Sequence, residues 1–372
     1  MKNILLIGAG GIGRRHIKGY LETKRAIISI IEPDKNKKMK NVLIIGAGGI
    51  GRRHIKGYLS TNRAILSIIE PDIEKIKKIQ KDFQIEKTFT SIEKVDLSEF
   101  DLAVICSPAN MHVEAMKVCA ENKLSFMVEK PLSTSMEGVD EVIELVKKNK
   151  LFARVGYTRR NSHVSRALKN QIDNNKVGDV KLVYINSSQE FPKYRPDYQT
   201  IYYAYPEMGG GAILDASTHM IDQLIWMIGK PSEVSCMFDR LVLKGTNTED
   251  TCLINIRFEN GSMANITVNQ FQKPNINSYE FIGTKGNLTL DHSILRFADD
   301  DSGKWKEEKD FMQGLDPMEV HQNNFLLQAE RILDGLEGKE CDLTTLEEAK
   351  LNLKVVFAAK QSWLEKKIIS IE

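Results

Sequence analysis

Three short stretches of the sequence place reactive side chains beside glycine or proline. They are residues 106–112 (CSPANMH), 129–131 (EKP) and 209–219 (GGGAILDASTH). In the last stretch Asp215 and His219 are four residues apart, and on a helix this spacing puts both side chains on one face. Histidine suits general acid–base work near neutral pH, and a nearby carboxylate can orient it. The pair predicts a proton-transfer site, although such pairs are also common on helix surfaces.

A glycine-rich turn indicates a second kind of chemistry. Residues 42–51 read VLIIGAGGIG, an apolar run followed by G-x-G-x-x-G at Gly46, Gly48 and Gly51. Such glycines make a tight turn, let backbone amides approach a diphosphate and let helix and strand pack closely. The diphosphate then lies at the N-terminus of the helix, where free N–H groups favour anions. This pattern predicts a dinucleotide site.

An acidic residue at the end of the next predicted strand bears on the choice of cofactor. Glu70 lies 19 residues beyond Gly51. A carboxylate there accepts hydrogen bonds from the adenosine ribose and repels a 2′-phosphate, which favours NAD over NADP. A solvent-exposed acid at a strand end is the alternative. Arg52 and Arg53 could help to neutralise phosphate or could form an exposed helical face.

The glycine-rich unit occurs twice. Residues 1–34 recur at 39–72, and only five of the 34 aligned positions differ. The reactive stretches occur once, so we expect a single site, built on the second copy. The first copy is too short to bury a stable core. We expect it to be docked loosely, engaged with another chain, or swapped into the place of the second copy, with these residues substituting for their counterparts: Gly8, Gly10, Gly13 and Glu32.

Alternating strands and helices must position these groups. From Lys40 to about residue 156 the pattern is typical of a parallel sheet covered on both faces. Beyond about residue 158, β-rich segments separated by hairpin turns predict a largely antiparallel sheet. Strands are expected at 42–45, 65–69, 102–106, 125–128, 152–156, 182–189, 234–243, 252–258, 263–269, 278–282, 287–290 and 294–297. Helices are expected at 50–59, 73–83, 111–120, 136–148, 213–228, 319–336 and 346–366.

Composition excludes several classes of protein. The 372 residues carry 52 basic and 50 acidic side chains, which argues against a nucleic-acid surface. Five scattered cysteines, with no C-x-x-C pair or Cys/His cluster, predict neither a disulfide framework nor a metal site. No 18-residue apolar run and no cleavable leader are present, so no membrane partner is expected. We predict a cytoplasmic protein.

Together, the glycine fingerprint, S-P-A-x-x-H, E-K-P and G-G-G-x-x-x-D-x-x-x-H resemble the Gfo/Idh/MocA family of sugar and polyol oxidoreductases. The resemblance covers residues 39–372. It implies hydride transfer between a secondary hydroxyl of a sugar, nucleotide sugar or cyclitol and a nicotinamide cofactor, which Glu70 predicts to be NAD rather than NADP. Lys130 matches the catalytic lysine of the family, and Asp215 and His219 match its acid and histidine. The sequence leaves open whether Lys130 or His219 accepts the proton.

The resemblance also implies an architecture. The fold class is α/β, with a Rossmann-type doubly wound parallel sheet plus a C-terminal α+β domain that has a large, open-faced, mostly antiparallel sheet. Residues 1–38 form the duplicated partial βαβ unit, 39–158 the NAD(P)-binding Rossmann domain, and 159–372 the substrate and oligomerisation domain. The last helix is expected to pack back on the Rossmann domain. The open sheet face is expected to build a homo-oligomer, a dimer or tetramer.

Further site residues follow from their places beside these motifs. His112 and Asn110 are expected to line the nicotinamide or substrate pocket, with capping and packing of a helix as the alternative. The aperiodic segment 191–206 predicts a lid, with a solvent loop or oligomer contact as the alternative. The resemblance suggests an activated or acidic sugar, which Lys193 and Arg195 could hold by its phosphate or carboxylate. The cofactor set is Gly46, Gly48, Gly49, Ile50, Gly51, Glu70, Ser107, Pro108, Asn110, His112, Glu129 and Lys130; the substrate set is Tyr157, Arg160, Lys193, Tyr194 and Arg195.

Two other functions fit the same fold. One is a glycoside hydrolase in which tightly held NAD oxidises the substrate transiently and is regenerated. The other is a non-catalytic NAD-sensing regulator, against which the presence of Lys130 and His219 argues.

Overall fold

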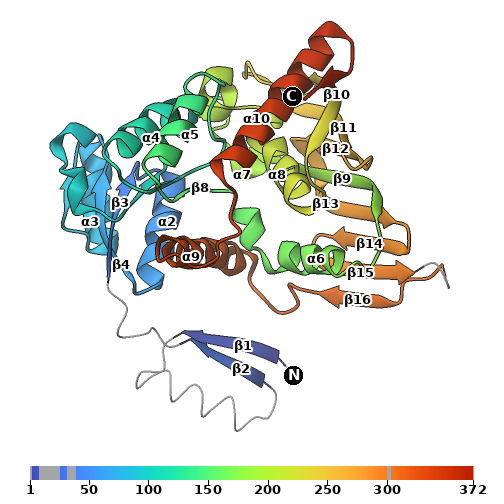
Figure 1. Ribbon diagram of the computed structural model, residues 1–372, viewed down its shortest axis with the longest axis horizontal. Coiled ribbons are helices and arrows are strands. Elements are labelled where there is room, and N and C mark those ends of the chain that lie inside the picture. The colour runs from blue at the N-terminus through green and yellow to red at the C-terminus, as the bar shows by residue number, and fades with distance from the viewer. Residues whose placement is uncertain (1, 8–25, 32–38, 300–302, 372) are drawn as a thin grey trace.

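The computed structural model describes residues 2–7, 26–31, 39–299 and 303–371 (Figure 1). Within them, a six-stranded sheet and a nine-stranded sheet form the body of the molecule, and helices cover them. This confirms the predicted fold class. Among the described helices, none has an apolar stretch long enough to span a bilayer.

The first sheet is wholly parallel and is built from short apolar runs. Its strands are β3 (Lys40–Ile45), β4 (Ala64–Ile69), β5 (Thr88–Phe89), β6 (Leu102–Ile105), β7 (Phe126–Val128) and β8 (Ala153–Val155). Their order is β5-β4-β3-β6-β7-β8. Strand order therefore reverses between β3 and β6, and a crevice for ligands opens at the carboxyl ends of such a pair.

Four helices connect these strands: α2 (Gly49–Ser60), α3 (Ile73–Phe83), α4 (His112–Glu121) and α5 (Val139–Lys148). Helix α3 begins where the Asp72 carboxylate accepts the backbone N–H groups of Glu74 and Lys75. This bond satisfies two of the donors that a helix start leaves free. The predicted helices at 50–59, 73–83, 111–120 and 136–148 are confirmed to within a few residues.

The second sheet is mixed, and only its central pair β9 and β12 is parallel. Its strand order is β16-β15-β14-β13-β9-β12-β11-β10-β17. Inward and outward side chains alternate, so that Ile254 and Ile256 are buried while Leu253 is exposed. The strands are β9 (Val180–Glu190), β10 (Pro231–Asp239), β11 (Thr251–Phe258), β12 (Met263–Asn269), β13 (Phe271–Gly283), β14 (Gly286–Asp291), β15 (Ile294–Asp299), β16 (Glu307–Asp310) and β17 (Ile369–Ser370).

The remaining helices join the two sheets. They are α6 (His163–Asp173), α7 (Phe191–Tyr194), the π-helical turn η7 (Ala212–Ser217), α8 (Thr218–Met227), α9 (Pro317–Leu336) and α10 (Leu346–Glu365). Figure 1 shows α9 beside α2. A Cβ on Gly57 would lie 2.8 Å from the Phe325 carbonyl oxygen, so glycine permits this close approach. The last helix, α10, packs mainly on α8 and β10. Helix α9 thus packs on the Rossmann domain through α2, and α10 also contacts β8 and α5 of that domain.

The repeat is described only in part. Strands β1 (Lys2–Ile7) and β2 (Ala26–Ile31) pair in parallel, with Lys2 opposite Ala26 as Lys40 is opposite Ala64 in the second copy. These two strands form a sheet of their own and join neither larger sheet. The glycines and acid of the first copy, Gly8, Gly10, Gly13 and Glu32, lie outside the described residues.

Candidate active site

The glycine-rich turn forms a cradle at the point where strand order reverses. A Cβ on Gly46, which has φ +92°, would lie 2.9 Å from the backbone of Cys106 and Ser107, and one on Gly51 would lie 2.1 Å from the Gly46 carbonyl oxygen. At Gly48 and Gly49 a Cβ would meet open space. Two glycines thus close the turn, and two leave room in front of α2. Helix α2 has no side-chain cap, so its first N–H groups are free to bind an anion.

Two polar groups border this cradle. The Glu70 carboxylate is buried and accepts the Ala47 N–H at 2.9 Å and the Asp72 N–H at 3.2 Å. The Ser107 hydroxyl is buried and has no hydrogen-bond partner among the described residues. A dinucleotide fits this set, because open space, free helix N–H groups and an unused hydroxyl lie along one edge. Pro108 and Asn110 are exposed beside Ser107.

Lys130 and Asp215 form the ionic centre of the reactive groups. The Lys130 Nζ donates to Asp215 Oδ1 at 2.7 Å and to the Asp215 carbonyl oxygen at 3.2 Å. The hydroxyl of Tyr202 lies 3.3 Å from Asp215 Oδ1. Lys130 follows the end of β7 and Asp215 lies in η7. Tyr202 belongs to the aperiodic segment 191–206, which is rich in tyrosine and is called the tyrosine-rich segment below. The Asp215 carboxylate raises the pKa of Tyr202, which keeps that hydroxyl protonated.

His219 lies beside this centre, and no hydrogen bond joins it to Asp215 in the described part of the chain. The predicted orienting contact from Asp215 to His219 is therefore not observed; the Asp215 carboxylate, which lies in the π-helical turn 212–217, pairs with Lys130 instead. The Tyr157 ring packs edge-on against His219, with ring centroids 5.9 Å apart. Nδ1 of His219 is buried without a hydrogen-bond partner in the described chain.

The charge state of His219 follows from its surroundings. Burial and the positive charges of Lys130 and Arg159 hold the pKa of His219 well below its ordinary value of 6.5. The imidazole is therefore neutral at pH 7, which is the form that accepts a proton.

These groups share a cavity of about 470 Å³ between the two sheets. The predicted residues Ile50, Glu129, Lys130, Asp215 and His219 all line it. The other walls carry many neutral hydrogen-bonding side chains, which suits a ligand with several hydroxyl groups. Those walls are made by Gly156, Thr158, Arg159, Ser187, Ser188, Gln189, Tyr202, Ala216, Met220, Asn275, Ile276, Asn277, His292, His321, Asn324 and Phe325.

Two buried histidines hold the segments that carry cavity residues. His54 of α2 was not predicted; its Nε2 lies 2.6 Å from Glu129 Oε1, in a buried pair that fixes the E-K-P segment against the cofactor helix. The His112 Nδ1 lies 2.8 Å from the Pro131 carbonyl oxygen and Nε2 2.9 Å from that of Ser107. Neither His112 nor Asn110 lines the cavity. For His112 the alternative of packing is the one observed, because both ring nitrogens are engaged by backbone carbonyls.

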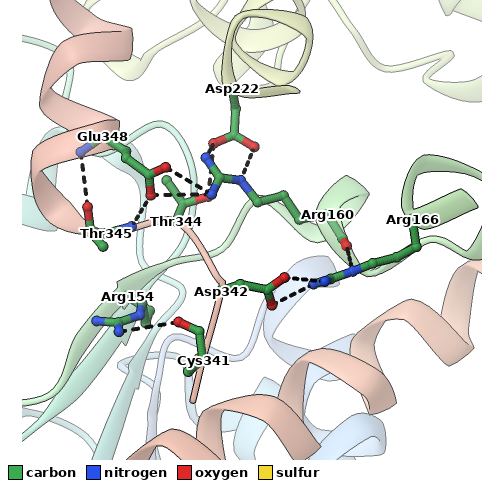
Figure 2. Close-up of polar contacts among 9 residues, drawn as sticks. All are labelled: Arg154, Arg160, Arg166, Asp222, Cys341, Asp342, Thr344, Thr345 and Glu348. Carbon is green, nitrogen blue, oxygen red and sulfur yellow. Dashed lines mark hydrogen bonds and ion pairs between the residues drawn. The ribbon is translucent and has the colours of Figure 1, made fainter. Parts of the chain in front are cut away.

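The predicted substrate residue Arg160 does not line the cavity, whereas its neighbour Arg159 does. Arg160 is almost fully buried; it binds both oxygens of Asp222, at 2.8 and 3.0 Å, and Glu348 at 3.1 Å (Figure 2). Asp222 also accepts the Thr344 hydroxyl at 2.8 Å. This cluster joins η4 (Thr158–Asn161) to α8 and α10, and its guanidinium has no access to the cavity.

The other predicted substrate residues also lie outside the cavity lining. Tyr157 is buried and acts on the site through its contact with His219. Lys193, Tyr194 and Arg195 are exposed, and the Tyr194 hydroxyl accepts Nδ2 of Asn275 at 2.7 Å. The tyrosine-rich segment therefore reaches the cavity through Tyr202 rather than through these three residues. Nothing in the described chain groups histidine, cysteine and carboxylate side chains as a metal site would.

Comparison with known proteins identifies the family of this chain. A model of the oxidoreductase family with an NAD-binding Rossmann fold matches residues 40–157, and one of the GFO/IDH/MocA C-terminal domain matches residues 165–289. The chain belongs to the Gfo/Idh/MocA family. It is thus an oxidoreductase with an NAD-binding Rossmann domain.

Several relatives of this Gfo/Idh/MocA protein cover most of its length. A myo-inositol 2-dehydrogenase of Thermotoga maritima is 24% identical over 309 residues, which are 80% of this chain and 88% of that protein. The WlbA dehydrogenase of Bordetella pertussis, solved with NADH and UDP-GlcNAcA, is 20% identical with a TM-score of 0.77, covering 91% of this chain and 99% of that one. A levoglucosan dehydrogenase solved with NADH and levoglucosan is 19% identical with a TM-score of 0.78, covering 90% and 100%. The two solved structures establish a shared fold.

Proposed function

We propose that this protein is an NAD-dependent dehydrogenase that oxidises a secondary hydroxyl of a sugar, nucleotide sugar or cyclitol. The observation that carries the proposal is the meeting of Lys130, Asp215 and His219 in one cavity at the carboxyl edge of the Rossmann sheet. The relatives support this proposal, since they include proteins named as inositol and levoglucosan dehydrogenases.

His219 is the proton acceptor in this proposal. Its pKa is lowered, so the neutral ring is available at pH 7 to take the hydroxyl proton. Lys130, held by Asp215 at 2.7 Å, donates to the reacting oxygen and stabilises the negative charge that develops there. Tyr202 holds the other side of that carboxylate. Bound NAD⁺ would supply the hydride acceptor, so that loss of the hydroxyl proton to His219 and of a hydride from the carbinol carbon would give a ketone and NADH.

The cofactor would be held by the glycine turn, with the diphosphate at the start of α2 and the adenosine ribose at Glu70. Glu70 supports NAD over NADP, because a buried carboxylate at this place repels a 2′-phosphate. Titration of NADH and NADPH by protein fluorescence tests this preference, and equal affinity for both would contradict it.

Turnover distinguishes this function from its alternatives. Purified protein is offered a panel of sugars, cyclitols and nucleotide sugars with NAD⁺, and NADH is followed by absorbance. A dehydrogenase accumulates NADH in proportion to the ketone formed. A glycoside hydrolase of the same fold would release a sugar with no net NADH, and a regulator would bind NAD and turn over nothing.

We also propose that the open face of the second sheet forms a homo-oligomer. Large apolar side chains are exposed on one face of four adjacent strands: Tyr184, Met237, Leu253 and Met263. An exposed apolar patch of this kind marks an association surface. Light scattering would give a dimer or tetramer for the wild type and a smaller species for Leu253→Arg. The cytoplasmic location stays a prediction.

A further inference from the structure

Arg159 presents a positive charge to the cavity wall with no acidic partner. Its Nη1 donates to the Tyr279 hydroxyl at 2.8 Å and lies 3.3 Å from Met220 Sδ, while Nη2 lies 3.4 Å from the Ser187 hydroxyl. None of these partners is charged. Among the described residues, no carboxylate lies within ion-pair distance of this guanidinium, although seven of the eleven other described arginines have one.

A buried chain of neutral hydrogen bonds fixes Arg159 in this position. The Tyr279 hydroxyl, which accepts from Arg159, donates to Gln223 Oε1 at 2.7 Å. Gln223 Nε2 in turn donates to the Ser165 hydroxyl at 2.9 Å. Tyr279, Gln223 and Ser165 are all buried. The side chain is thus held by packing and by uncharged groups, so its orientation does not depend on a counter-ion.

The positive charge of Arg159 affects the titration of two histidines of the cavity. It lowers the pKa of His219 and of His321, both of which line the same cavity. Met220, which Arg159 touches, directly follows His219 in α8. Arg159 therefore contacts the residue next to the proposed base and lines the same cavity. A half-buried cation loses part of its hydration, and an anion bound beside it would offset that loss.

We propose that Arg159 binds an anionic oxygen group of the substrate, a carboxylate or a phosphate, while Lys130 and His219 act on a hydroxyl of the same molecule. The inference rests on the proposed function and narrows it to acidic sugars. The neutral side chains around Arg159 complete the recognition: Ser187, Gln189, Asn275 and Asn277 offer hydrogen bonds to the remaining hydroxyls. A guanidinium suits this role because its planar donors match the oxygens of a carboxylate or phosphate.

Binding to the NADH-loaded protein tests the inference without turnover. Calorimetric titrations compare D-glucose with D-glucuronate and D-glucose 6-phosphate, and the same three forms of D-galactose. These ligands share their ring hydroxyls and differ at C6, and the two acids distinguish carboxylate from phosphate. We expect at least one acid to bind about 10–100-fold more tightly than its neutral parent, the range of a charge-assisted hydrogen bond.

Three variants test whether Arg159 causes the preference for acids over neutral sugars. Arg159→Gln should lose about tenfold or more of the affinity for the acid and much less of that for the parent sugar, and Arg159→Lys should restore part of it. Arg296→Gln is the matched control, because Arg296 of β15 pairs with Glu308 of β16 and does not line the cavity. If no acid binds better than its parent, or if Arg159→Gln weakens both equally, the inference is overturned.

Turnover measured on the same ligands separates this inference from the proposed function. Acid binding that depends on Arg159, without NADH formation from NAD⁺ and any ligand, would leave the anion site standing and remove the dehydrogenase. Oxidation of neutral sugars with no preference for their acids would support the dehydrogenase and remove the anion site.

Discussion

Arg159 and Arg160 follow one another in a single turn and lie in opposite electrostatic surroundings. Arg160 is buried between Asp222 and Glu348, which neutralise it and join three elements of the chain (Figure 2). Arg159 faces the cavity and touches only neutral groups. The partners of each guanidinium, and not its type or its place in the sequence, therefore distinguish the arginine that joins elements of the chain from the one that faces the cavity. Variants on the cavity side should change activity, whereas variants on the buried side should change stability.

The largest effect is expected from the cavity side. Lys130→Met removes the donor to the reacting oxygen and leaves Asp215 unpaired, so turnover should fall by about 10³-fold or more. NADH binding, followed by fluorescence, should persist because the glycine turn is untouched. Turnover within about tenfold of wild type would contradict the assigned role, since one lost transition-state donor typically costs more than that.

The next effect is expected from the buried side. Arg160→Gln leaves the Asp222 carboxylate buried and unpaired, which should lower the free energy of unfolding by about 3–5 kcal/mol. Urea denaturation measures this change. Arg159→Gln should cost less than about 1 kcal/mol, because it breaks only hydrogen bonds to neutral groups. Equal losses for the two variants would erase the distinction between the arginines.

A smaller effect concerns pH. His219 accepts a proton only when neutral, and its lowered pKa keeps it neutral below pH 6.5, so kcat/KM should hold its value to well below that pH. Removing the positive charge in Arg159→Gln lets the pKa of His219 rise, and the acidic limb should move to higher pH. The same limb should stay in place in Arg160→Gln. The limb is measured with a neutral substrate, and a move to lower pH would contradict the sign.

The smallest effect is expected at the N-terminus. Both arginine environments, the glycine cradle and the cavity are built from residues 39–372. A protein that begins at Met39 should therefore bind NADH and turn over substrate within about twofold of the full chain, because the sheet that holds the cradle is complete without residues 1–38. Loss of NADH binding would show that the first copy contributes to the site.

Much of the fold could be predicted, because its signals are local. The apolar runs of β3 and β4 and the glycines after β3 carry strand, turn and helix within 30 residues. The elements that were missed have weak local signals: β16 reads EEKD, β5 and β17 have two residues each, and α6 is mostly polar. Edge strands of this kind are held by their neighbours rather than by their own hydrophobic pattern.

The sequence could predict which residues belong to the candidate site, but not which of their side chains pair with one another. Lys130, Asp215 and His219 share a cavity, yet Asp215 pairs with Lys130, which lies 85 residues away in the sequence, and not with His219. No local pattern in the sequence reveals such a distant partner. Arg159 and Arg160 are equally basic and adjacent, and only the distant Asp222 and Glu348 decide which of them is buried.

The contact between α2 and α9 sets a limit on how this protein can be divided. Ala329, Ile332 and Leu333 of α9 complete the core beneath α2, and Arg63 at the start of β4 binds Glu330 and Glu337 of the same helix. A fragment ending near residue 158 would expose that core to water. In a chimaera that exchanges substrate domains, α9 would have to travel with the nucleotide-binding half, although more than 150 residues of sequence separate them. Inheritance of the two halves as independent modules is therefore restricted by one helix, which also carries Phe325 into the cavity.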